Sequence, residues 1–204
     1  MTILVTDPSL EERLILERKN AGADRYDEVW EGVYVMTPMP NVEHQEFVTG
    51  LASIFQEIVV WPRLGKVCAG LNLSDRDDDW EHDYRVPDVA VFLNETRAEN
   101  LDTHLRGAVD FLVEVTSPGD RTREKLPFYG RLGVRELLVV DRQTWALELY
   151  AFQSGALQKR GRCTLETGDT LRSTILPLTF RLVAGEPRPQ IEVTQTEGGR
   201  SWLV

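Results

Sequence analysis

Two carboxylates interrupt otherwise apolar, strand-like segments of the sequence. Asp88 follows Pro87 in the run VPDVAVFL, and Glu114 lies within the run FLVEV. Burying an ionised carboxylate is costly unless the group is paired or bound to a metal. If the two strands are neighbours, both side chains can point to one end of the sheet, where they would repel each other without a cation.

A divalent metal ion would resolve this repulsion. Mg²⁺ takes hard oxygen ligands and is often bound by only one or two carboxylates plus water. Such a metal lowers the pKa of a bound water and stabilises the charge on a phosphate in the transition state. We therefore expect Asp88 and Glu114 to hold Mg²⁺, or Mn²⁺ in its place, for phosphodiester chemistry. In the alternative interpretation, each acid caps a turn or pairs with an arginine such as Arg85 or Arg106.

Hydrolysis of a phosphodiester also benefits from a cation beside the attacking water and the scissile phosphate. Thr116 stands two residues after Glu114, where a lysine on the same strand face would serve. The nearest lysine is Lys125, near the first turn of the helix expected after this strand. A helix packed against the strand ends could bring its ammonium to the acids, so we expect Lys125 to be the third catalytic residue. The alternative is a solvated surface lysine, the commoner position for this residue type.

Charge is unevenly distributed along the chain. Residues 121–135 contain five basic side chains and one acid, whereas residues 74–83 contain six acids and one arginine. We expect three arginines of the basic segment to contact backbone phosphates, which positions DNA without reading its sequence: Arg121, Arg123 and Arg131. The net charge of −10 argues against a protein that coats nucleic acid non-specifically, because an acidic surface repels the duplex. Both segments could also be no more than solvated surface.

Glu43 and His44 lie in the first turn of an expected amphipathic helix. Glu43 could join Asp88 and Glu114 as a metal ligand, and His44 could touch a phosphate of the DNA backbone or orient a water. Capping of the helix start and hydration at the surface are the alternative roles.

The positions of these residues depend on the elements around them. Asp7 and Pro8 are typical of a helix start, and this helix is expected to reach about Lys19. The segment Val29–Met36 fits two short strands. Asn41 can cap a helix whose apolar residues recur at three- and four-residue steps: Phe47, Leu51, Ile54, Phe55 and Ile58.

Three strand-like segments follow, and the last two are nearly continuous apolar runs, as in strands covered on both faces: Lys66–Leu73, Arg85–Leu93 and Val109–Thr116. A helix over about residues 120–132, with Gly133 as its C-terminal stop, comes next. Strands at Glu136–Asp141 and Trp145–Phe152 follow, and residues 156–182 fit further short strands. This order predicts an α/β or α+β domain with a mixed central β-sheet flanked by helices.

The length of 204 residues suits one well-buried domain, which we place at residues 1–185. Residues 186–204 are rich in Pro, Gln, Thr and Gly, and we interpret them as a C-terminal extension. No run approaches the roughly 18 apolar residues of a membrane span, and no secretion signal is expected. Cys68 and Cys163 lie far apart and fit no metal spacing, so free thiols in a reducing cytoplasm are expected.

Longer strings of the sequence carry a family resemblance. They are PDVAVFL (87–93), DFLVEVTSP (110–118) and REKLPFYGRLGVRELLVVD (123–141), preceded by EVWEGVYVMTP (28–38). The strings occur in the same order and at matching spacing over most of the domain, from about Tyr26 to Tyr150. Through them the chain resembles the Uma2 family of restriction endonucleases, within the PD-(D/E)XK nuclease superfamily.

The resemblance implies a restriction-endonuclease-like fold in which Asp88 and Glu114 hold Mg²⁺. It also implies that the motif lysine has moved from the strand to the helix, onto Lys125, with Tyr129 one turn later. The chain departs from the family or superfamily pattern at three places: Leu137-Leu138 replaces an aromatic pair, Pro127 lies in the lysine helix, and Thr116 replaces the strand lysine. The last departure is common in this branch of the superfamily.

We therefore expect a Mg²⁺-dependent DNA endonuclease that hydrolyses phosphodiester bonds and uses no organic cofactor. Cutting both strands of a duplex generally needs two sites, so a homodimer is expected. The alternative is a catalytically inactive nuclease fold that serves as a binding or scaffold module, which the overall acidity and Pro127 favour. Acid–base hydrolysis of a small substrate is a third hypothesis, but the sequence contains no pattern that suggests a sugar-binding aromatic cleft.

Overall fold

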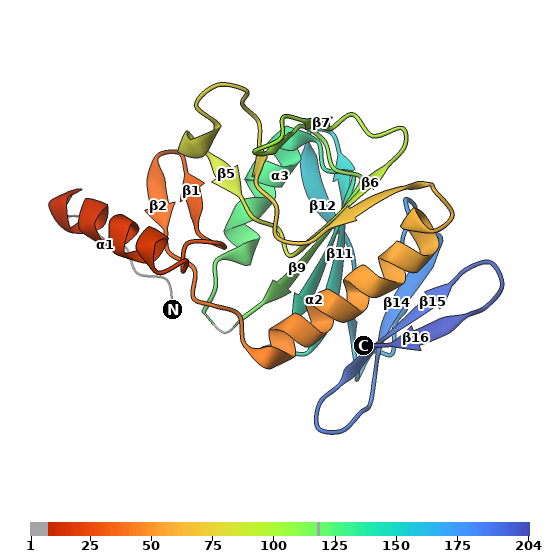
Figure 1. Cartoon of the computed structure of the whole chain (residues 1–204). Helices are drawn as coiled ribbons and strands as arrows, with labels where there is room; N and C mark the ends of the chain where they lie inside the picture. Colours follow the sequence, from red (N-terminus) through yellow and green to blue (C-terminus); the bar gives the residue numbers. More distant parts are fainter. Residues whose placement is uncertain (1–7, 118) are drawn as a thin grey trace.

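The computed structural model describes residues 8–117 and 119–204 (Figure 1). Its helical segments are α1 (Pro8–Asn20), α2 (Val42–Phe55), the π-helical η1 (Gln56–Val60), the 3₁₀ segments η2 (Trp80–His82) and η3 (Thr122–Lys125), and α3 (Leu126–Leu132). The helices predicted near the start of the chain, after Asn41 and before Gly133 are all present. Asp7, the predicted N-cap of the first helix, lies outside the described residues.

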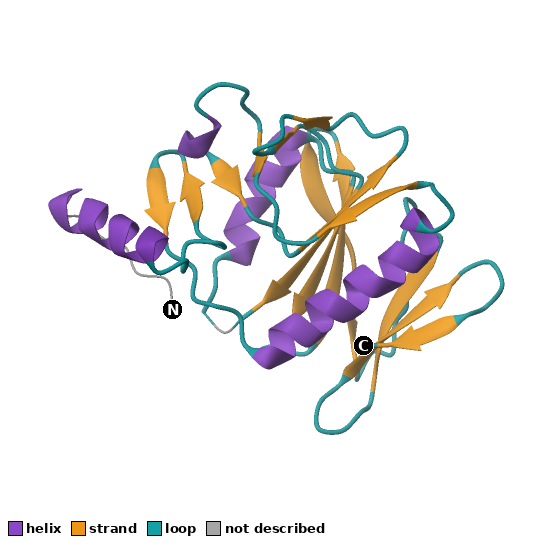
Figure 2. Ribbon diagram, in the orientation of Figure 1, coloured by secondary structure: helices purple, strands orange, loops and turns teal. Residues whose placement is uncertain are grey.

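A six-stranded sheet forms the centre of the fold, in the order β12-β11-β10-β9-β6-β3 (Figure 2). Its strands are β3 (Gly65–Cys68), β6 (Val89–Leu93), β9 (Phe111–Thr116), β10 (Glu136–Asp141), β11 (Ala146–Gln153) and β12 (Ala156–Thr164). Strands β9 and β10 run parallel, and the other neighbouring pairs are antiparallel. The prediction of a mixed central sheet flanked by helices is confirmed.

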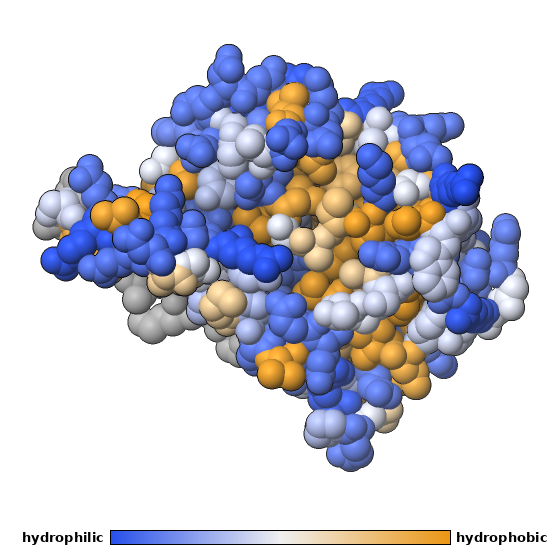
Figure 3. Space-filling view, viewed as in Figure 1, coloured by the Kyte–Doolittle hydropathy of each residue, from blue (hydrophilic) through white to orange (hydrophobic). Residues whose placement is uncertain are grey.

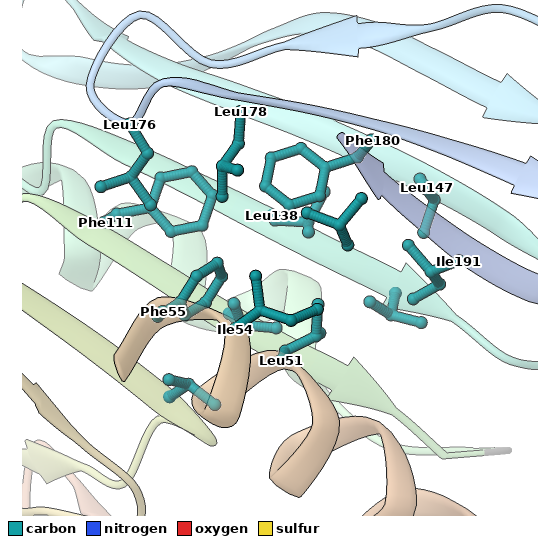
Figure 4. Close-up of a cluster of buried hydrophobic side chains, with 14 of the residues drawn as sticks. Leu51, Ile54, Phe55, Phe111, Leu138, Leu147, Leu176, Leu178, Phe180 and Ile191 are labelled. Carbon is teal, nitrogen blue, oxygen red and sulfur yellow. The ribbon is translucent and has the colours of Figure 1, made fainter. Parts of the chain in front are cut away.

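One face of the central sheet is covered by α2 and by a four-stranded sheet. The strands of that second sheet are β13 (Leu171–Arg172), β14 (Leu178–Val183), β15 (Gln190–Gln195) and β16 (Ser201–Leu203). Figure 4 shows Phe55 of α2 beside Phe111 of β9, with Leu51 of α2 and Phe180 of β14 in the same cluster. These side chains are fully buried, so the helix and both sheets share one hydrophobic core.

The opposite face of the central sheet is covered by α3. Phe128 and Tyr129 of this helix are buried against Leu112 of β9 and Leu137 of β10. Because side chains alternate between the two faces along a strand, Glu114 shares this face with Leu112, two residues before it. The predicted site acid therefore lies on the side of the sheet that carries α3.

A third sheet of short strands stands beside the central one, in the order β2-β1-β5-β4-β8-β7. Its strands are β1 (Glu28–Trp30), β2 (Val33–Val35), β4 (Leu73–Ser74), β5 (Tyr84–Arg85), β7 (Glu99–Asn100) and β8 (Leu105–Arg106). The predicted pair β1 and β2 turns at Glu31 and Gly32, which have φ angles of 51° and 85°. Glycine adopts such positive angles readily, so Gly32 suits this turn.

The C-terminal segment is part of the packed fold, and the description of residues 186–204 as an extension is corrected accordingly. Strand β15 pairs with β14 on one side and with β16 on the other. Ile191 and Val193 are fully buried in the core shared with α2. The two residues alternate with polar neighbours, which is the pattern of a half-buried strand, and the polar composition of the segment conceals it.

None of the helices in the described part of the chain is long and apolar enough to span a bilayer. In the space-filling view of Figure 3, hydrophobic side chains gather near the middle of the visible face, and hydrophilic ones cover much of its upper part. Cys68 and Cys163 are free thiols, half-buried and buried respectively, so the prediction of unpaired cysteines is confirmed.

Candidate active site

Glu114 belongs to a row of three side chains that crosses the central sheet. It is level with Val139 of β10, and Val139 is opposite Glu148 of β11. Partners in register project from the same face of a sheet, so all three face the α3 side. Glu114 is only 3% exposed. It lies near the carboxyl ends of the parallel strands β9 and β10, where ligand sites commonly form in sheets of this kind.

Lys125 reaches Glu114 from the last residue of η3. Its Nζ lies 3.1 Å from Glu114 Oε1 and 2.8 Å from Glu28 Oε1, and its side chain is 13% exposed. Pro127 is compatible with this placement, because a proline in the first turn of α3 removes no intrahelical hydrogen bond. Lys125 is therefore a nearly buried partner of two acids and not a solvated surface lysine.

Glu28 is a member of the site that sequence reasoning missed. It opens β1, and its carboxylate accepts hydrogen bonds from the Val86 backbone N–H (2.8 Å) and the Trp30 indole N–H (2.7 Å), in addition to its ion pair with Lys125. Strand β1 has three residues, which is too short for a periodic burial pattern. The available clue is its place at the start of EVWEGVYVMTP, one of the family strings.

Asp88 approaches the same place from the start of β6. Its Oδ2 accepts a hydrogen bond from the Val115 backbone N–H (2.7 Å), and its Oδ1 lies 2.9 Å from His44 Nε2. Because Val115 follows Glu114 directly, this bond ties Asp88 to the strand that carries the other acid. Asp88 and Glu114 also border one cavity. The structure thus brings the two predicted acids together.

His44 is a buried partner of Asp88. It is 9% exposed, and its backbone N–H is capped by Asn41 Oδ1 at 3.0 Å, as the sequence predicts for the helix start. Its ring Nε2 faces Asp88, whereas its Nδ1 is buried and has no hydrogen-bond partner among the described residues. His44 borders the cavity, but its contact is with a predicted metal ligand and not with an open surface.

The hydroxyl group of Tyr129 donates a hydrogen bond to the Glu114 carboxylate. Tyr129 lies in α3, close to one turn after Lys125. Burial is the main cause that raises the pKa of Tyr129 well above its usual value, and the negative charges of Glu114 and Glu28 add to it. The hydroxyl therefore remains a hydrogen-bond donor. Together with Lys125, it fixes the orientation of the Glu114 carboxylate.

The residues Glu28, Asp88, Glu114 and Lys125, called the Glu114 cluster below, carry more negative than positive charge. Burial raises the pKa of Glu114 most strongly; Lys125 lowers it, Asp88 and Glu28 raise it again, and the net shift is upward. Burial also lowers the pKa of the Lys125 ammonium, but the charges of Glu114 and Glu28 more than reverse this effect. Lys125 therefore stays protonated.

The donor set fits a divalent cation with hard oxygen ligands. An added cation would relieve the repulsion between Asp88 and Glu114, which Lys125 leaves only partly compensated. Within residues 8–117 and 119–204, no three His, Cys, Asp or Glu side chains are grouped closely enough to form a protein cage for a metal. Two carboxylates are a number of protein ligands that Mg²⁺ commonly uses, with waters as its remaining ligands.

The cavity beside the Glu114 cluster has a volume of about 260 Å³. Arg142 is part of its wall, although the sequence around this residue contains no motif that singles it out. Its guanidinium donates to the Thr116 carbonyl (3.0 Å) and to the Ser117 hydroxyl (2.7 Å), which holds the end of β9 in place. Arg142 thus adds a fixed positive charge to the cavity wall.

Glu43 is directed to Arg142 and away from the acids. Its Oε1 lies 2.7 Å from Arg142 Nη1, its side chain is 37% exposed, and it is not part of the cavity wall. Consecutive helical residues point in directions about 100° apart, so only one of Glu43 and His44 can face Asp88. The geometry places His44 there and does not support Glu43 as a metal ligand.

Of the three arginines predicted to contact DNA, only Arg121 borders the cavity. Its guanidinium lies 4.6 Å from the ring centroid of Trp30 and forms an ion pair with Glu124. The hydrogen bond from Arg121 Nε to Glu124 Oε1 measures 2.9 Å. Since Arg121 is more than a third exposed, part of its guanidinium remains available at the cavity mouth.

The other two arginines lie elsewhere. Arg123 Nη2 is 2.6 Å from Asp141 and 3.3 Å from Glu148, on the neighbouring part of the same sheet face. Arg131 Nη2 is 3.1 Å from the buried acid Asp83, and neither arginine belongs to the cavity wall. The basic segment is therefore split among separate acidic partners, so it does not form the continuous patch that its sequence suggests.

Comparisons with known proteins agree with this arrangement of motifs. A crystal structure titled as that of a "putative nuclease belonging to DUF820", from Anabaena variabilis, has a TM-score of 0.57 to this chain, with 18% sequence identity, and the match covers 72% of this chain and 80% of that one. At this identity the likeness establishes a shared fold. Among curated proteins, none matches the chain. The Uma2 family model, described as "Putative restriction endonuclease", matches residues 10–185. The resemblance in the sequence motifs is thus confirmed, and the chain belongs to the Uma2 family.

Proposed function

We propose that the protein is a Mg²⁺-dependent endonuclease, also able to use Mn²⁺, that hydrolyses phosphodiester bonds in DNA. The descriptions of its family as a restriction endonuclease and of its structural neighbour as a nuclease support this class. The proposal rests above all on the Glu114 cluster, in which a nearly buried lysine joins two buried glutamates beside Asp88 at a cavity wall. Burying such charges brings little stability, because their desolvation offsets their attraction.

Asp88 and Glu114 hold the metal ion in this proposal. When bound, Mg²⁺ supplies a more acidic water and stabilises negative charge on the phosphate. His44 orients Asp88 through the contact of its Nε2 with Oδ1. Tyr129 and Lys125 orient Glu114 from the α3 side. Each acid is therefore held in one position before any substrate arrives.

Lys125 acts through its charge and its N–H groups. Because the surrounding acids raise its pKa, the ammonium persists at neutral pH and cannot serve as a general base. It offsets the negative charge that develops on the phosphate in the transition state, which is commonly the largest single contribution to catalysis. Glu28, whose Oε1 lies 2.8 Å from Nζ, helps to keep the ammonium in place.

A homodimer in the cytoplasm completes the proposal. Two sites are needed to cut both strands of a duplex in one encounter, and each chain contributes one Glu114 cluster. The free thiols at Cys68 and Cys163 are compatible with a reducing compartment. Light scattering coupled to size-exclusion chromatography tests the assembly, and a monomer mass both with and without DNA would exclude the dimer.

The cleavage itself is tested with supercoiled plasmid in the presence of Mg²⁺ or Mn²⁺. Wild-type protein is expected to nick the plasmid, and Asp88→Asn is expected to abolish nicking because it removes a metal-binding carboxylate. Glu136→Gln is the matched control. Glu136 is a buried acid on β10, but its partners are Ser173 and Thr174, away from the cavity.

The outcomes separate the two leading hypotheses. Nicking lost in Asp88→Asn and retained in Glu136→Gln supports the metal site. Full activity in Asp88→Asn would contradict the assignment of this carboxylate. If purified wild type binds Mg²⁺ in a calorimetric titration yet never nicks the plasmid, the inactive binding or scaffold module becomes the better description.

A further inference from the structure

A second group of charged residues lies on the same sheet face, two strands from Glu114. At its centre is Glu148, which is 4% exposed. Arg123 reaches Glu148 and Asp141, Lys159 Nζ lies 2.7 Å from Glu148 Oε1, and Arg162 Nε lies 3.9 Å from the same atom. These five residues, called the Glu148 cluster below, contain three cations and two acids.

A β-bulge in β12 gives the cluster two of its cations. Lys159 is level with Tyr150 and Arg162 is level with Glu148, so three steps along β12 match two steps along β11. Arg160 is the extra residue of the bulge. In a regular strand, residues three apart point to opposite faces, so the bulge is what turns Lys159 and Arg162 to the same side.

The acids of the cluster are inside and the cations reach outward. Glu148 and Asp141 have side chains 5% and 8% exposed, whereas those of Arg123, Lys159 and Arg162 are 47%, 43% and 46% exposed. Three cations around two acids leave a positive surplus at the surface of a chain whose net charge is −10. Stability alone requires no such surplus, because exposed ion pairs contribute little.

The ion pairs also hold the cations in defined positions. Arg123 uses Nε and Nη2 on the two acids, so its Nη1 remains directed away from them. Lys159 lies over the ring of Tyr150, with Nζ 5.5 Å from the centroid. A guanidinium or ammonium fixed in this way loses less conformational entropy when it binds an anion.

The cluster lies next to the proposed active site. Arg123 and Lys125 come from the same short segment, η3, and each contacts one of the two buried glutamates in the row across the sheet. Two strand spacings separate Glu114 from Glu148, or roughly 9–10 Å. Strand β12 is the outermost strand of the central sheet, and the side chains of Lys159 and Arg162 are more than two-fifths exposed there.

We propose that Arg123, Lys159 and Arg162 form a binding surface for the phosphate backbone of DNA that enters or leaves the Glu114 cluster. The identity of the partner rests on the proposed function, whereas the surface itself is defined by the bulge and the ion pairs. Phosphate oxygens would be contacted by donors that the buried acids already position. Such contacts provide affinity and register without sequence readout.

The surface is tested by the salt dependence of DNA binding. Anisotropy of a fluorescein-labelled mixed-sequence duplex, measured in EDTA over a range of NaCl concentrations, gives the slope of log Kd against log salt. The double variant Lys159→Gln/Arg162→Gln is expected to bind more weakly and to reduce this slope by about 1.8, since each lost phosphate contact removes about 0.9.

Arg172→Gln/Arg181→Gln is the matched control for this measurement. It removes the same number of positive charges from exposed arginines, but on β13 and β14 of the four-stranded sheet. The control is expected to keep the wild-type slope. Equal slopes in wild type and in the Lys159→Gln/Arg162→Gln variant would overturn the proposal.

A measurement on the wild-type protein keeps the proposal testable if that variant does not fold. The lysines of the chain are Lys19, Lys66, Lys125 and Lys159, and reductive methylation followed by mass spectrometry reports each separately. The labelled duplex is expected to slow methylation of Lys159 severalfold while the exposed Lys19 and Lys66 react as before. Unchanged methylation of Lys159 at saturating DNA would overturn the surface.

These results are distinguishable from those that test cleavage. If wild type nicks the plasmid, Asp88→Asn does not, and DNA fails to protect Lys159, the nuclease function is supported and the proposed binding surface is contradicted. If DNA protects Lys159 and the Lys159→Gln/Arg162→Gln variant has a reduced salt slope, but no form of the protein nicks the plasmid, the binding surface is supported and the nuclease function is contradicted.

Discussion

The central sheet carries two buried glutamates in one row, and the structure compensates their charges in opposite ways. Glu114 has one cation, Lys125, and two further acids, Asp88 and Glu28, around it. Burial raises its pKa most; Lys125 lowers it, but the two neighbouring acids leave the net shift upward. Added positive charge would therefore reduce the repulsion within this group, which borders a cavity.

Glu148 is about as little exposed as Glu114, but the charges around it are mainly positive. Burial again raises its pKa, but the hydrogen bonds from Lys159 and Tyr150 and the charge of Arg123 outweigh this effect, so the pKa is lowered. Three cations approach this one acid. The comparison teaches that an acid inside an apolar strand does not by itself indicate a metal site; the balance of charge among its neighbours decides.

The largest expected effect is loss of cleavage when the cation of the Glu114 cluster is removed. Lys125→Met keeps the length of the side chain and removes its charge, so phosphate charge in the transition state is no longer offset. Plasmid nicking by this variant is expected to be about 10²–10³-fold slower. Lys159→Met, which removes a lysine from the Glu148 cluster, is expected to weaken DNA binding instead, and equal losses of cleavage at saturating protein would erase the distinction.

The next largest effect is expected from added Mg²⁺, to which the two clusters should respond differently. Only the Glu114 cluster has a negative surplus, so Mg²⁺ is expected to raise the melting temperature of wild type and EDTA to reverse the rise. At a metal concentration 100 times Kd the gain in unfolding free energy is about 2.7 kcal/mol. Asp88→Asn is expected to lose the gain, and an equal shift in this variant would place the metal elsewhere.

Neutral substitutions of the two glutamates are expected to change stability with opposite signs in EDTA. Glu114→Gln removes a repelled charge, and we expect the free energy of unfolding to rise by on the order of 1 kcal/mol. Glu148→Gln leaves Lys159 without its acid and Arg123 with Asp141 alone, and we expect a loss of about 1–3 kcal/mol. Urea unfolding of both variants measures the difference, and changes of the same sign would contradict the comparison.

The pH dependence of stability follows from the two pKa shifts. The folded pKa of Glu148 lies below its unfolded value of about 4.3, so its stabilisation is present above that pH and is lost as the pH falls through the folded value. The folded pKa of Glu114 lies above 4.3, so its destabilisation grows as the pH rises from there. In EDTA, the plot of unfolding free energy against pH should become flatter below about pH 4.3 in Glu148→Gln and above it in Glu114→Gln. Identical pH profiles for the two variants would argue against both shifts.

The smallest effect is expected at Arg131, which belongs to neither cluster. Its ion pair with Asp83 is partly exposed, so Arg131→Gln should cost about 0–1 kcal/mol of stability. Nicking and the salt slope of DNA binding are expected to remain at wild-type values. A slope reduced by about 0.9 would show that the arginine contacts a phosphate after all.

Much of the framework could be predicted from the sequence, because local patterns determine it. Strand β10 occupies the predicted residues Glu136–Asp141, and Asn41 caps α2 as its position suggests. The approach of Lys125 to Glu114 was also accessible, since the strand, the turn and the helix follow one another within a short stretch of chain. Local order of this kind leaves few alternative arrangements.

The missed features depend on residues far apart in the sequence. Glu28 meets Lys125 across nearly 100 positions, and Arg142 meets Glu43 across a similar span, so neither pair has a local signal. The alternation of Ile191 and Val193 was a usable signal, but the polar composition around them masked it. The basic run at 121–135 misled for the same reason, because most of its acidic partners come from distant parts of the chain.

The bulge at Arg160 lets an odd residue spacing place two cations on one face of the sheet. Lys159 and Arg162 are three residues apart, and in a regular strand of the same length one of them would point away from Glu148. Deleting Arg160 would restore strict alternation to β12 and would leave the two cations two residues apart, still on one face. Related chains could therefore gain or lose the bulge by a single-residue insertion or deletion while keeping both the surface cations and the catalytic residues.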